Sequence, residues 1–212
     1  TLFLWGCATS PTGRNQLIVV NEGSIEPMAA QSFEKMKTEG KVSRNAALNR
    51  YVDCVVSPLV TEAKQRYQFL PQSWEVVVFE SDDINAFAMP GGKIGVYTGI
   101  IRLTETPDQL AAVMGHEIGH VIARHAAERM SSAQLTALAV TATGVVLAEN
   151  KNQRAVLAAL GLGAQVGILL PFSRLHESEA DDVGQELMAR AGFDPQQAIR
   201  LWQLMGSQGG GR

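Results

Sequence analysis

Apolar residues recur at three- and four-residue intervals along most of this chain, which is the spacing of one face of a helix. The pattern predicts helices over about 24–38, 44–67, 107–130, 132–148, 154–170, 175–191 and 195–206. The third of these has clear start signals. Thr106 is a suitable N-cap, Pro107 fits the first helical position, and Asp108 suits the positive end of the helix dipole.

Two short segments carry a strand pattern instead. β-Branched and aromatic residues fill SWEVVVFES, residues 73–81, and KIGVYTG, residues 93–99, is a second short strand. The sequence Pro90-Gly91-Gly92 just before it predicts a turn. Because helices dominate and strands are few, the sequence predicts an α+β fold that is predominantly α-helical and contains a small β-sheet.

The composition is that of one ordinary globular domain. The 212 residues are 46% hydrophobic, which is enough for a proper core. The net charge of −3 gives no indication of binding to nucleic acid or to an anionic surface. Of the two cysteines, Cys54 lies in the helical pattern NRYVDCVVSPLV and is expected to be a buried, small apolar residue. No disulfide with Cys7 is expected.

The candidate chemistry lies in VMGHEIGHVIARH, residues 113–125, which holds three of the four histidines. His116 and His120 are four residues apart, so a helix places both imidazoles on one face, where they can bind one metal ion. Glu117 lies one step round the helix, within reach of a water on the metal but poorly placed as a ligand. This H-E-x-x-H pattern indicates two zinc ligands and a general base. The alternative, a surface helix with scattered polar residues, fits poorly with the apolar neighbours of the motif.

A catalytic zinc site needs a third protein ligand, with the fourth position left to water. The third histidine of the metzincin pattern is absent, because Ala126 stands at its position. His125 follows His120 by five residues and so lies about 140° round the helix. We therefore expect His125 on the helix surface or beside a ligand, and not on the metal.

Carboxylates for the third position occur in SRLHESEADDVGQELMARAGFDP, a later helix that Gly192 ends. Spacing alone does not choose between Glu177 and Glu179, and acidic residues that favour the helix dipole are the plain alternative. Glu177 and Asp181 are four residues apart and share a face. A ligand carboxylate at one and a hydrogen bond from a ligand histidine to the other would fit that spacing.

Several segments, in this order, resemble one protein family. HEIGH, followed downstream by ESEAD from Glu177 to Asp181, resembles the HtpX-like and CaaX-prenyl-protease-like zinc metallopeptidases (metallopeptidase family forty-eight). BepA-like bacterial lipoprotein and periplasmic members belong to this family. INAFAMPGGKIGVYTGII resembles the family's segment before the zinc helix, and AGFDP resembles the turn after its second metal helix. The resemblance covers about residues 12–205 and implies a zincin-like (gluzincin) metalloprotease domain, expected as a single domain over 12–212.

The family pattern E-x-x-A-D makes its first glutamate the metal ligand. The resemblance therefore implies one Zn²⁺ per chain, held by His116, His120 and Glu177. It also implies that Glu117 is the catalytic residue and that Asp181 orients a ligand histidine.

Family members carry a later segment with a histidine and an arginine that stabilise the oxyanion. Nothing in this chain matches that segment. Those groups are therefore expected beyond the end of this chain, or other residues serve. Arg174 and His176 are nearby candidates.

A small sheet beside the zinc helix offers an edge to which a peptide substrate can add as a further strand. The resemblance implies this substrate-binding use for Asn85, Ala86, Phe87 and Ala88. The alternative is an ordinary β-hairpin in the core.

The first residues, TLFLWGCATSPTGR, form an apolar run ending in Gly-Cys and followed by small and polar residues. This looks like the end of a bacterial lipoprotein signal that leaves Cys7 as the lipidated residue. Residues 1–11 are therefore expected to be a signal remnant and tether, and Ala8 after the cysteine resembles outer-membrane sorting. A cysteine in a disordered tail is the alternative.

Together these features predict a zinc metalloendopeptidase, a hydrolase of the bacterial cell envelope, periplasmic and anchored as a lipoprotein at the outer membrane. Its expected partners are a polypeptide substrate and a membrane reached through Cys7, and no nucleic acid is expected. The resemblance implies that the substrates are misfolded or unassembled envelope proteins. The apolar runs 135–148 and 155–170 are short for a span of about 20 residues, so a buried or membrane-facing hairpin over 135–170 is expected. A zinc-binding envelope chaperone or assembly factor without proteolysis is the alternative, and an intact Glu117 argues against it.

Overall fold

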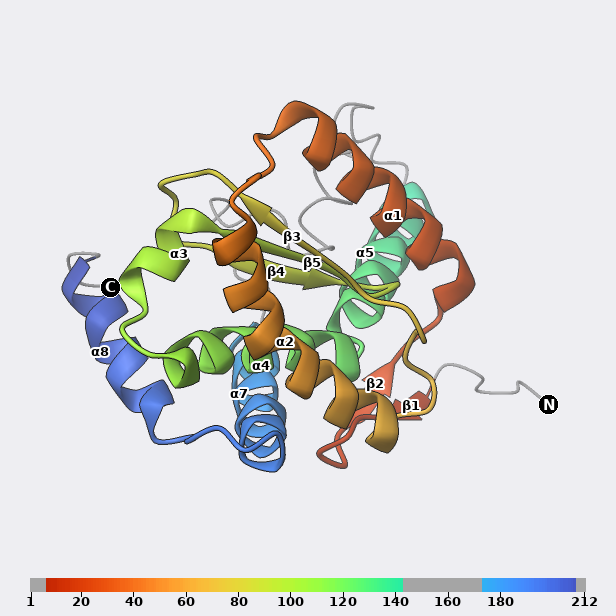
Figure 1. The fold of residues 1–212 in the computed structure, drawn as a ribbon. Coiled ribbons are helices and arrows are strands. Elements are labelled where there is room, and N and C mark those ends of the chain that lie inside the picture. The colour runs from red at the N-terminus through yellow and green to blue at the C-terminus, as the bar shows by residue number, and fades with distance from the viewer. Residues whose placement is uncertain (1–6, 143–172, 209–212) are drawn as a thin grey trace.

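The computed structural model describes residues 7–142 and 173–208 of the chain (Figure 1). The elements in chain order are β1 (Cys7–Thr9), β2 (Asn15–Leu17), α1 (Glu22–Glu39), α2 (Ala46–Arg66), β3 (Glu75–Phe79), β4 (Ala86–Met89), β5 (Lys93–Tyr97), α3 (Thr98–Leu103), α4 (Pro107–Ile122), α5 (His125–Ala142), α7 (Ser173–Arg190) and α8 (Gln197–Gln208). Helices surround a small central sheet, which confirms the predicted α-rich α+β class.

The central sheet has three strands in the order β3-β5-β4. β3 pairs parallel with β5, and β4 pairs antiparallel with β5 through the predicted Pro90–Gly92 turn. Gly91 and Gly92 have φ of 79° and 71°, a left-handed conformation that glycine adopts without steric cost. Among the described strands β4 has no partner on its outer side, so it is an edge of the sheet.

Each face of the sheet covers its own hydrophobic core, because alternate residues of a strand point to opposite faces. The larger core lies between the sheet and α2, α4, α7 and α8, and includes Val56, Ile94, Ile118, Leu187 and Leu201. The smaller core lies under α1 and includes Ile25, Phe33, Phe79, Phe87 and Met89. In Figure 1 α1 and α4 accordingly lie on opposite sides of the sheet.

Helix α4 begins as predicted but ends earlier. The Thr106 hydroxyl accepts a hydrogen bond from the Gln109 N–H, and Pro107 is the first residue of the helix. The expected continuous helix over 107–130 is wrong, because Arg124 has a left-handed φ of 57° that separates α4 from α5. Neither Ala123 nor Arg124 is a helix breaker by propensity, so this break depends on tertiary contacts.

Helix α7 crosses α4 at backbone contact. A Cβ atom placed on Gly184 would lie 2.7 Å from the Gly115 carbonyl carbon and 2.8 Å from the His116 nitrogen. A Cβ on Gly119 would lie 2.7 Å from the Ala180 carbonyl oxygen. Only residues without a side chain permit this approach, which brings the first turns of α7 against the H-E-x-x-H motif.

The first described residues of the chain form a short β-hairpin. Cys7–Thr9 form β1, which pairs antiparallel with β2 in the register Cys7↔Leu17 to Thr9↔Asn15. Cys7 is therefore the first residue of a strand. Three-residue strands are too short to give an alternating pattern, which is why the sequence did not indicate this hairpin.

Two further predictions concern residues on or near the surface. Cys54 is exposed and not buried, because the buried face of α2 is formed by Val52, Val55, Val56 and Leu59. No helix within the described part of the chain combines the length and apolar character needed to cross a membrane. The predicted helix 154–170 and most of the 135–170 hairpin lie outside the described residues.

Candidate metal centre

Three candidate ligands converge between α4 and α7. His116 Nε2 lies 3.1 Å from His120 Nε2 and 3.2 Å from Glu177 Oε2, and His120 Nε2 lies 3.6 Å from Glu177 Oε1. In a tetrahedral zinc site, bonds of about 2.0–2.2 Å place ligand atoms about 3.4 Å apart. The observed spacings fit one ion bound by all three residues. Glu179, which spacing alone had left as an alternative ligand, is not in this cluster.

Asp181 holds the first histidine from behind. Its Oδ1 lies 2.7 Å from His116 Nδ1, on the side of the ring opposite Glu177. A carboxylate accepts a hydrogen bond, so His116 carries its hydrogen on Nδ1 and leaves Nε2 for a metal. Burial lowers the pKa of His116, but Asp181 and Glu177 outweigh it and raise the pKa to about 10. A metal ion therefore has to displace a proton when it binds.

Electrostatics also distinguish the candidate ligand from its neighbour. The adjacent His116 and His120 rings lower the pKa of the Glu177 carboxyl against the effect of burial. Burial raises the pKa of Glu179, but contacts from Ser10, Thr12 and other donors bring it down to about 2. Both glutamates are ionised at neutral pH. Glu179 is 4% exposed and faces away from the ligand cluster.

The predicted base, Glu117, lies beside the ligand cluster and next to the edge strand. It accepts a backbone hydrogen bond from Ala88 of β4. Burial raises its pKa, while the neighbouring histidines oppose this. A carboxyl group held between the zinc helix and the sheet edge is placed to exchange a proton with a substrate lying along β4.

Two cavities flank the ligands, and β4 joins them. One, of about 100 Å³, is lined by Asn85, Ala86, His116 and Glu117 together with apolar residues of α4, α7 and α8. The other, of about 60 Å³, is lined by Ala88, His120 and residues of α1 and α5. The predicted stretch 85–88 therefore runs from one cavity to the other past the candidate base.

Phe87 differs from the rest of this stretch. Its ring lies 6.2 Å from those of Phe33 and Phe79 and is 4% exposed, so the side chain belongs to the core under α1. Only its backbone is at the sheet edge. The alternation of a strand explains why Ala86 and Ala88 face the cavities and Phe87 does not.

The other basic candidates lie in different places. His176 is 1% exposed, stacks on His125 with a ring separation of 4.1 Å, and contacts Glu128. It therefore belongs to the layer behind His120, while Arg174 is exposed at the start of α7. Arg129, which the sequence analysis did not single out, lines the smaller cavity with His120. Burial lowers its pKa, whereas the charges of Glu177 and Glu117 raise it.

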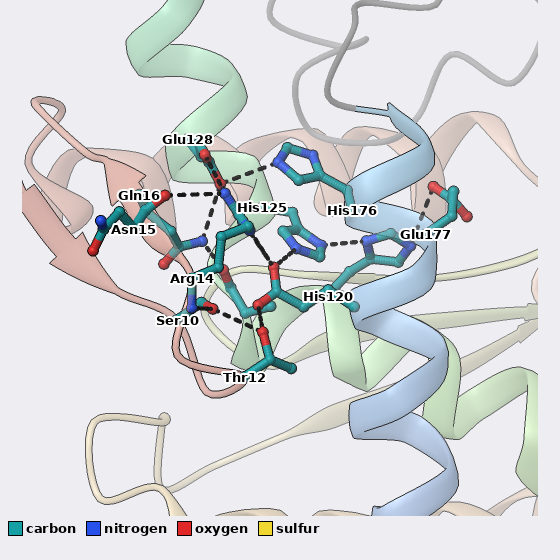
Figure 2. Close-up of polar contacts among 12 residues, drawn as sticks. Ser10, Thr12, Arg14, Asn15, Gln16, His120, His125, Glu128, His176 and Glu177 are labelled. Carbon is teal, nitrogen blue, oxygen red and sulfur yellow. Dashed lines mark hydrogen bonds and ion pairs between the residues drawn. The ribbon is translucent and has the colours of Figure 1, made fainter.

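His125 is fully buried and does not lie on the helix surface. The break after α4 turns it toward the ligand helix, so that its Nδ1 is 2.7 Å from His120 Nδ1 and its Nε2 is 3.0 Å from Glu179 Oε2 (Figure 2). Burial lowers the pKa of His125 to about 3, so the ring is neutral. His125 therefore lies beside the candidate ligand His120, which is one of the two positions that the sequence analysis expected for it.

A helix bearing H-E-x-x-H, a second helix bearing a carboxylate, and a small sheet alongside define a zincin-like metallopeptidase fold. The chain belongs to peptidase family M48, whose family model matches residues 46–209. This confirms the resemblance seen in the motifs. The family assignment also makes the protein metal-dependent.

Curated relatives carry protease names. The mitochondrial metalloendopeptidase OMA1 of Schizosaccharomyces pombe is 40% identical over 132 residues, which cover 62% of this chain and 37% of that protein. The beta-barrel assembly-enhancing protease of Escherichia coli K12 is 34% identical over 179 residues, or 82% of this chain and 36% of that protein. Bovine mitochondrial OMA1 is 29% identical over 202 residues, 92% and 38% of the two chains. The chain thus spans little more than a third of the length of these relatives.

Proposed function

We propose that the protein is a zinc-dependent endopeptidase in which His116, His120 and Glu177 bind the metal. Two imidazole nitrogens and one carboxylate form the ligand set of many catalytic zinc sites, with one position left open. A structural zinc site would usually have four protein ligands, and the cluster among the described residues has three. Bound zinc would supply Lewis acidity that activates water and polarises a peptide carbonyl.

The chain's own residues would then carry the proton. Glu117 takes a proton from the attacking water and delivers it to the leaving amine. Asp181 keeps the His116 ring oriented throughout. The observation that carries the proposal is the position of Glu117, next to the ligand cluster and hydrogen-bonded to the Ala88 N–H of the edge strand. A protein that used zinc only for binding would not need this base.

The substrate would be an extended peptide along Asn85–Ala88. The outer side of β4 is an edge among the described strands, and backbone groups there can hold a peptide by hydrogen bonds. Side chains of the peptide would enter the two cavities beside His116 and His120. Backbone recognition of this kind suits unfolded polypeptides, because it reads no particular sequence.

The test is hydrolysis of unfolded casein by zinc-loaded wild type and by Glu117→Gln, with zinc content measured in both. We expect Glu117→Gln to bind zinc normally but to lose activity by about 10²–10⁴-fold. Equal cleavage by the two proteins would sink the role of Glu117. Zinc in both proteins and cleavage by neither would favour the chaperone or assembly-factor alternative.

For the cellular setting we propose a bacterial envelope protein, lipidated at Cys7 and anchored at the outer membrane. The lipoprotein-like start of the sequence supports this, and a relative in Escherichia coli is named for β-barrel assembly. Misfolded or unassembled envelope proteins would be the substrates. The full precursor and its Cys7→Ser variant, labelled with a fatty acid in bacteria and fractionated, test the anchor. Incorporation of the labelled fatty acid into the variant, or its absence from the wild type, would rule out the lipid anchor on Cys7.

A further inference from the structure

The β1–β2 hairpin carries Arg14 into the interior, between α5 and α7. The Arg14 side chain is 16% exposed and lies between the carboxylates of Glu128 in α5 and Glu179 in α7, whose side chains are 6% and 3% exposed. Arg14 donates to both oxygens of Glu128 at 2.8 and 2.7 Å and to Glu179 Oε2 at 3.0 and 2.7 Å. The fixed fork of a guanidinium can hold two carboxylates at once.

From Arg14, a short series of contacts leads to a candidate metal ligand (Figure 2). Glu179 Oε2 lies 3.0 Å from His125 Nε2, and His125 Nδ1 lies 2.7 Å from His120 Nδ1. Thr12 of the hairpin turn donates to the other oxygen of Glu179 at 2.5 Å. Both oxygens of Glu179 are therefore fixed by the hairpin.

These contacts determine which nitrogen of each ring carries hydrogen. A carboxylate beside a guanidinium can only accept, so His125 donates from Nε2. A neutral imidazole has one N–H, so His125 Nδ1 must accept, and His120 must donate from its own Nδ1. His120 Nε2 is then left without hydrogen and faces His116 Nε2 at 3.1 Å. This is the lone pair that a metal ion requires.

The hairpin also supports the turn from which His125 projects. Gln16 of β2 donates from Nε2 to the Ala123 carbonyl at 2.6 Å and to Glu128 Oε2 at 3.0 Å. Ala123 lies in the break between α4 and α5. Without that break, helical geometry would point His125 about 140° away from His120.

We propose that the β1–β2 hairpin is a positioning element of the metal centre, in which Arg14, through Glu179 and His125, fixes the tautomer and orientation of the His120 ring. The inference rests on the proposed role of His120 as a zinc ligand. An ion-pair network with a purely structural role would stabilise the fold but leave the affinity for zinc unchanged. The two roles therefore differ in a measurable quantity.

The experiment measures the zinc Kd of the protein by competition with a chromophoric chelator, together with the absorption spectrum of the Co²⁺-substituted protein. The variants are Arg14→Gln and Glu179→Gln. Residues that support metal ligands typically change metal affinity by about 10–100-fold, and we expect that loss and an altered Co²⁺ spectrum in both variants. Arg14→Lys keeps the charge but not the fork, so its Kd should be intermediate.

Glu75→Gln is the matched control. Glu75 is a carboxylate that accepts from Lys37 at 2.6 Å and from Lys93 at 2.8 Å, in an ion-pair cluster on the sheet. It does not contact the histidines. Its variant should lose stability without changing the zinc Kd or the Co²⁺ spectrum. If the three glutamine variants lose stability alike and all bind zinc as wild type does, the network is structural only and the proposal is wrong.

A double-mutant cycle tests the route. His125→Gln should itself weaken zinc binding, and adding Arg14→Gln to it should change the Kd by no more than about twofold, because the path is already broken. If the fold-changes in Kd of the two single variants multiply in the double variant, Arg14 acts on the metal by another path and the proposal is overturned. If Arg14→Gln does not fold, Arg14→Lys takes its place. No step needs a substrate, so failure to cleave casein would leave this result unaffected.

Discussion

The close crossing of α4 and α7 gives a prediction that separates stability from metal binding. In Gly184→Ala the new Cβ would lie 2.7 Å from the Gly115 carbonyl carbon, and ordinary van der Waals contact begins near 3.4 Å. The Cβ is fixed to the backbone of α7 and the atom it meets belongs to the backbone of α4, so no side chain can rotate away. Helices α4 and α7 must move apart by about 0.7 Å at this point, a lower bound taken from the two distances.

The two consequences of this shift differ in size. Overpacking costs about 1–3 kcal/mol, and replacing glycine by alanine in a helix returns about 1 kcal/mol, so the free energy of unfolding should fall by at most about 2 kcal/mol. Metal sites tolerate departures of only about 0.2 Å in ligand distance. Glu177 on α7 should therefore be displaced from the histidines on α4, and zinc affinity should fall by about tenfold or more.

The assay is the zinc Kd by chelator competition, with urea unfolding of the zinc-free protein measured in parallel. Gly206→Ala is the control, because a Cβ at Gly206 in α8 meets no atom within 4 Å. That variant should be unchanged in zinc affinity and slightly more stable. Wild-type zinc affinity in a folded Gly184→Ala protein would refute the idea that the spacing of α4 and α7 sets the ligand geometry.

Two further predictions concern the break after α4 and the network behind it. Arg124→Gly and Arg124→Ala both lose the ion pair with Glu22, but only glycine adopts the left-handed φ without strain. The free energy of unfolding in urea should therefore be higher for the glycine variant by about 1 kcal/mol. Equal stabilities of the two variants would contradict this. The pKa of Glu179 is about 2 in the folded protein against 4.5 as a reference, so its carboxylate stabilises the fold above about pH 4.5. That contribution, about 3 kcal/mol, should disappear as pH falls through about 4 toward 2. In urea unfolding of the zinc-free protein, the free energy of unfolding of Glu179→Gln should therefore depend less on pH below 4.5 than that of wild type. The same acid dependence in both proteins would rule out the lowered pKa of Glu179.

The sequence was informative where function depends on spacing along one helix. His116 and His120 are four residues apart on one helix, and Glu177 and Asp181 are four residues apart on another, so helical geometry predicts that each pair shares a face. The choice of Glu177 over Glu179 needed the family pattern, and the structure places only Glu177 in the ligand cluster. Both glutamates start the same helix, and it is the rotation of α7 against α4 that distinguishes them.

The network behind His120 could not be predicted in this way. Arg14 and Glu179 are 165 residues apart, and the strands that present Arg14 have three residues each. No periodic pattern marks such short strands, and an isolated arginine near a chain terminus ordinarily indicates a solvated surface. Long-range pairing of buried charges depends on the tertiary fold, and a single sequence carries no local signal of it.

The break between α4 and α5 shows how local helix preference and tertiary contacts are connected. A continuous helix was the better prediction from local preference, and it placed His125 away from the metal ligands. The protein instead holds Arg124 in a left-handed conformation that costs about 1–2 kcal/mol. The hydrogen bond from Gln16 to the Ala123 carbonyl offsets part of this, and so does the ion pair of Arg124 with Glu22. What the break provides is the contact between His125 and His120, so the departure from local preference lies where the proposed metal centre requires it.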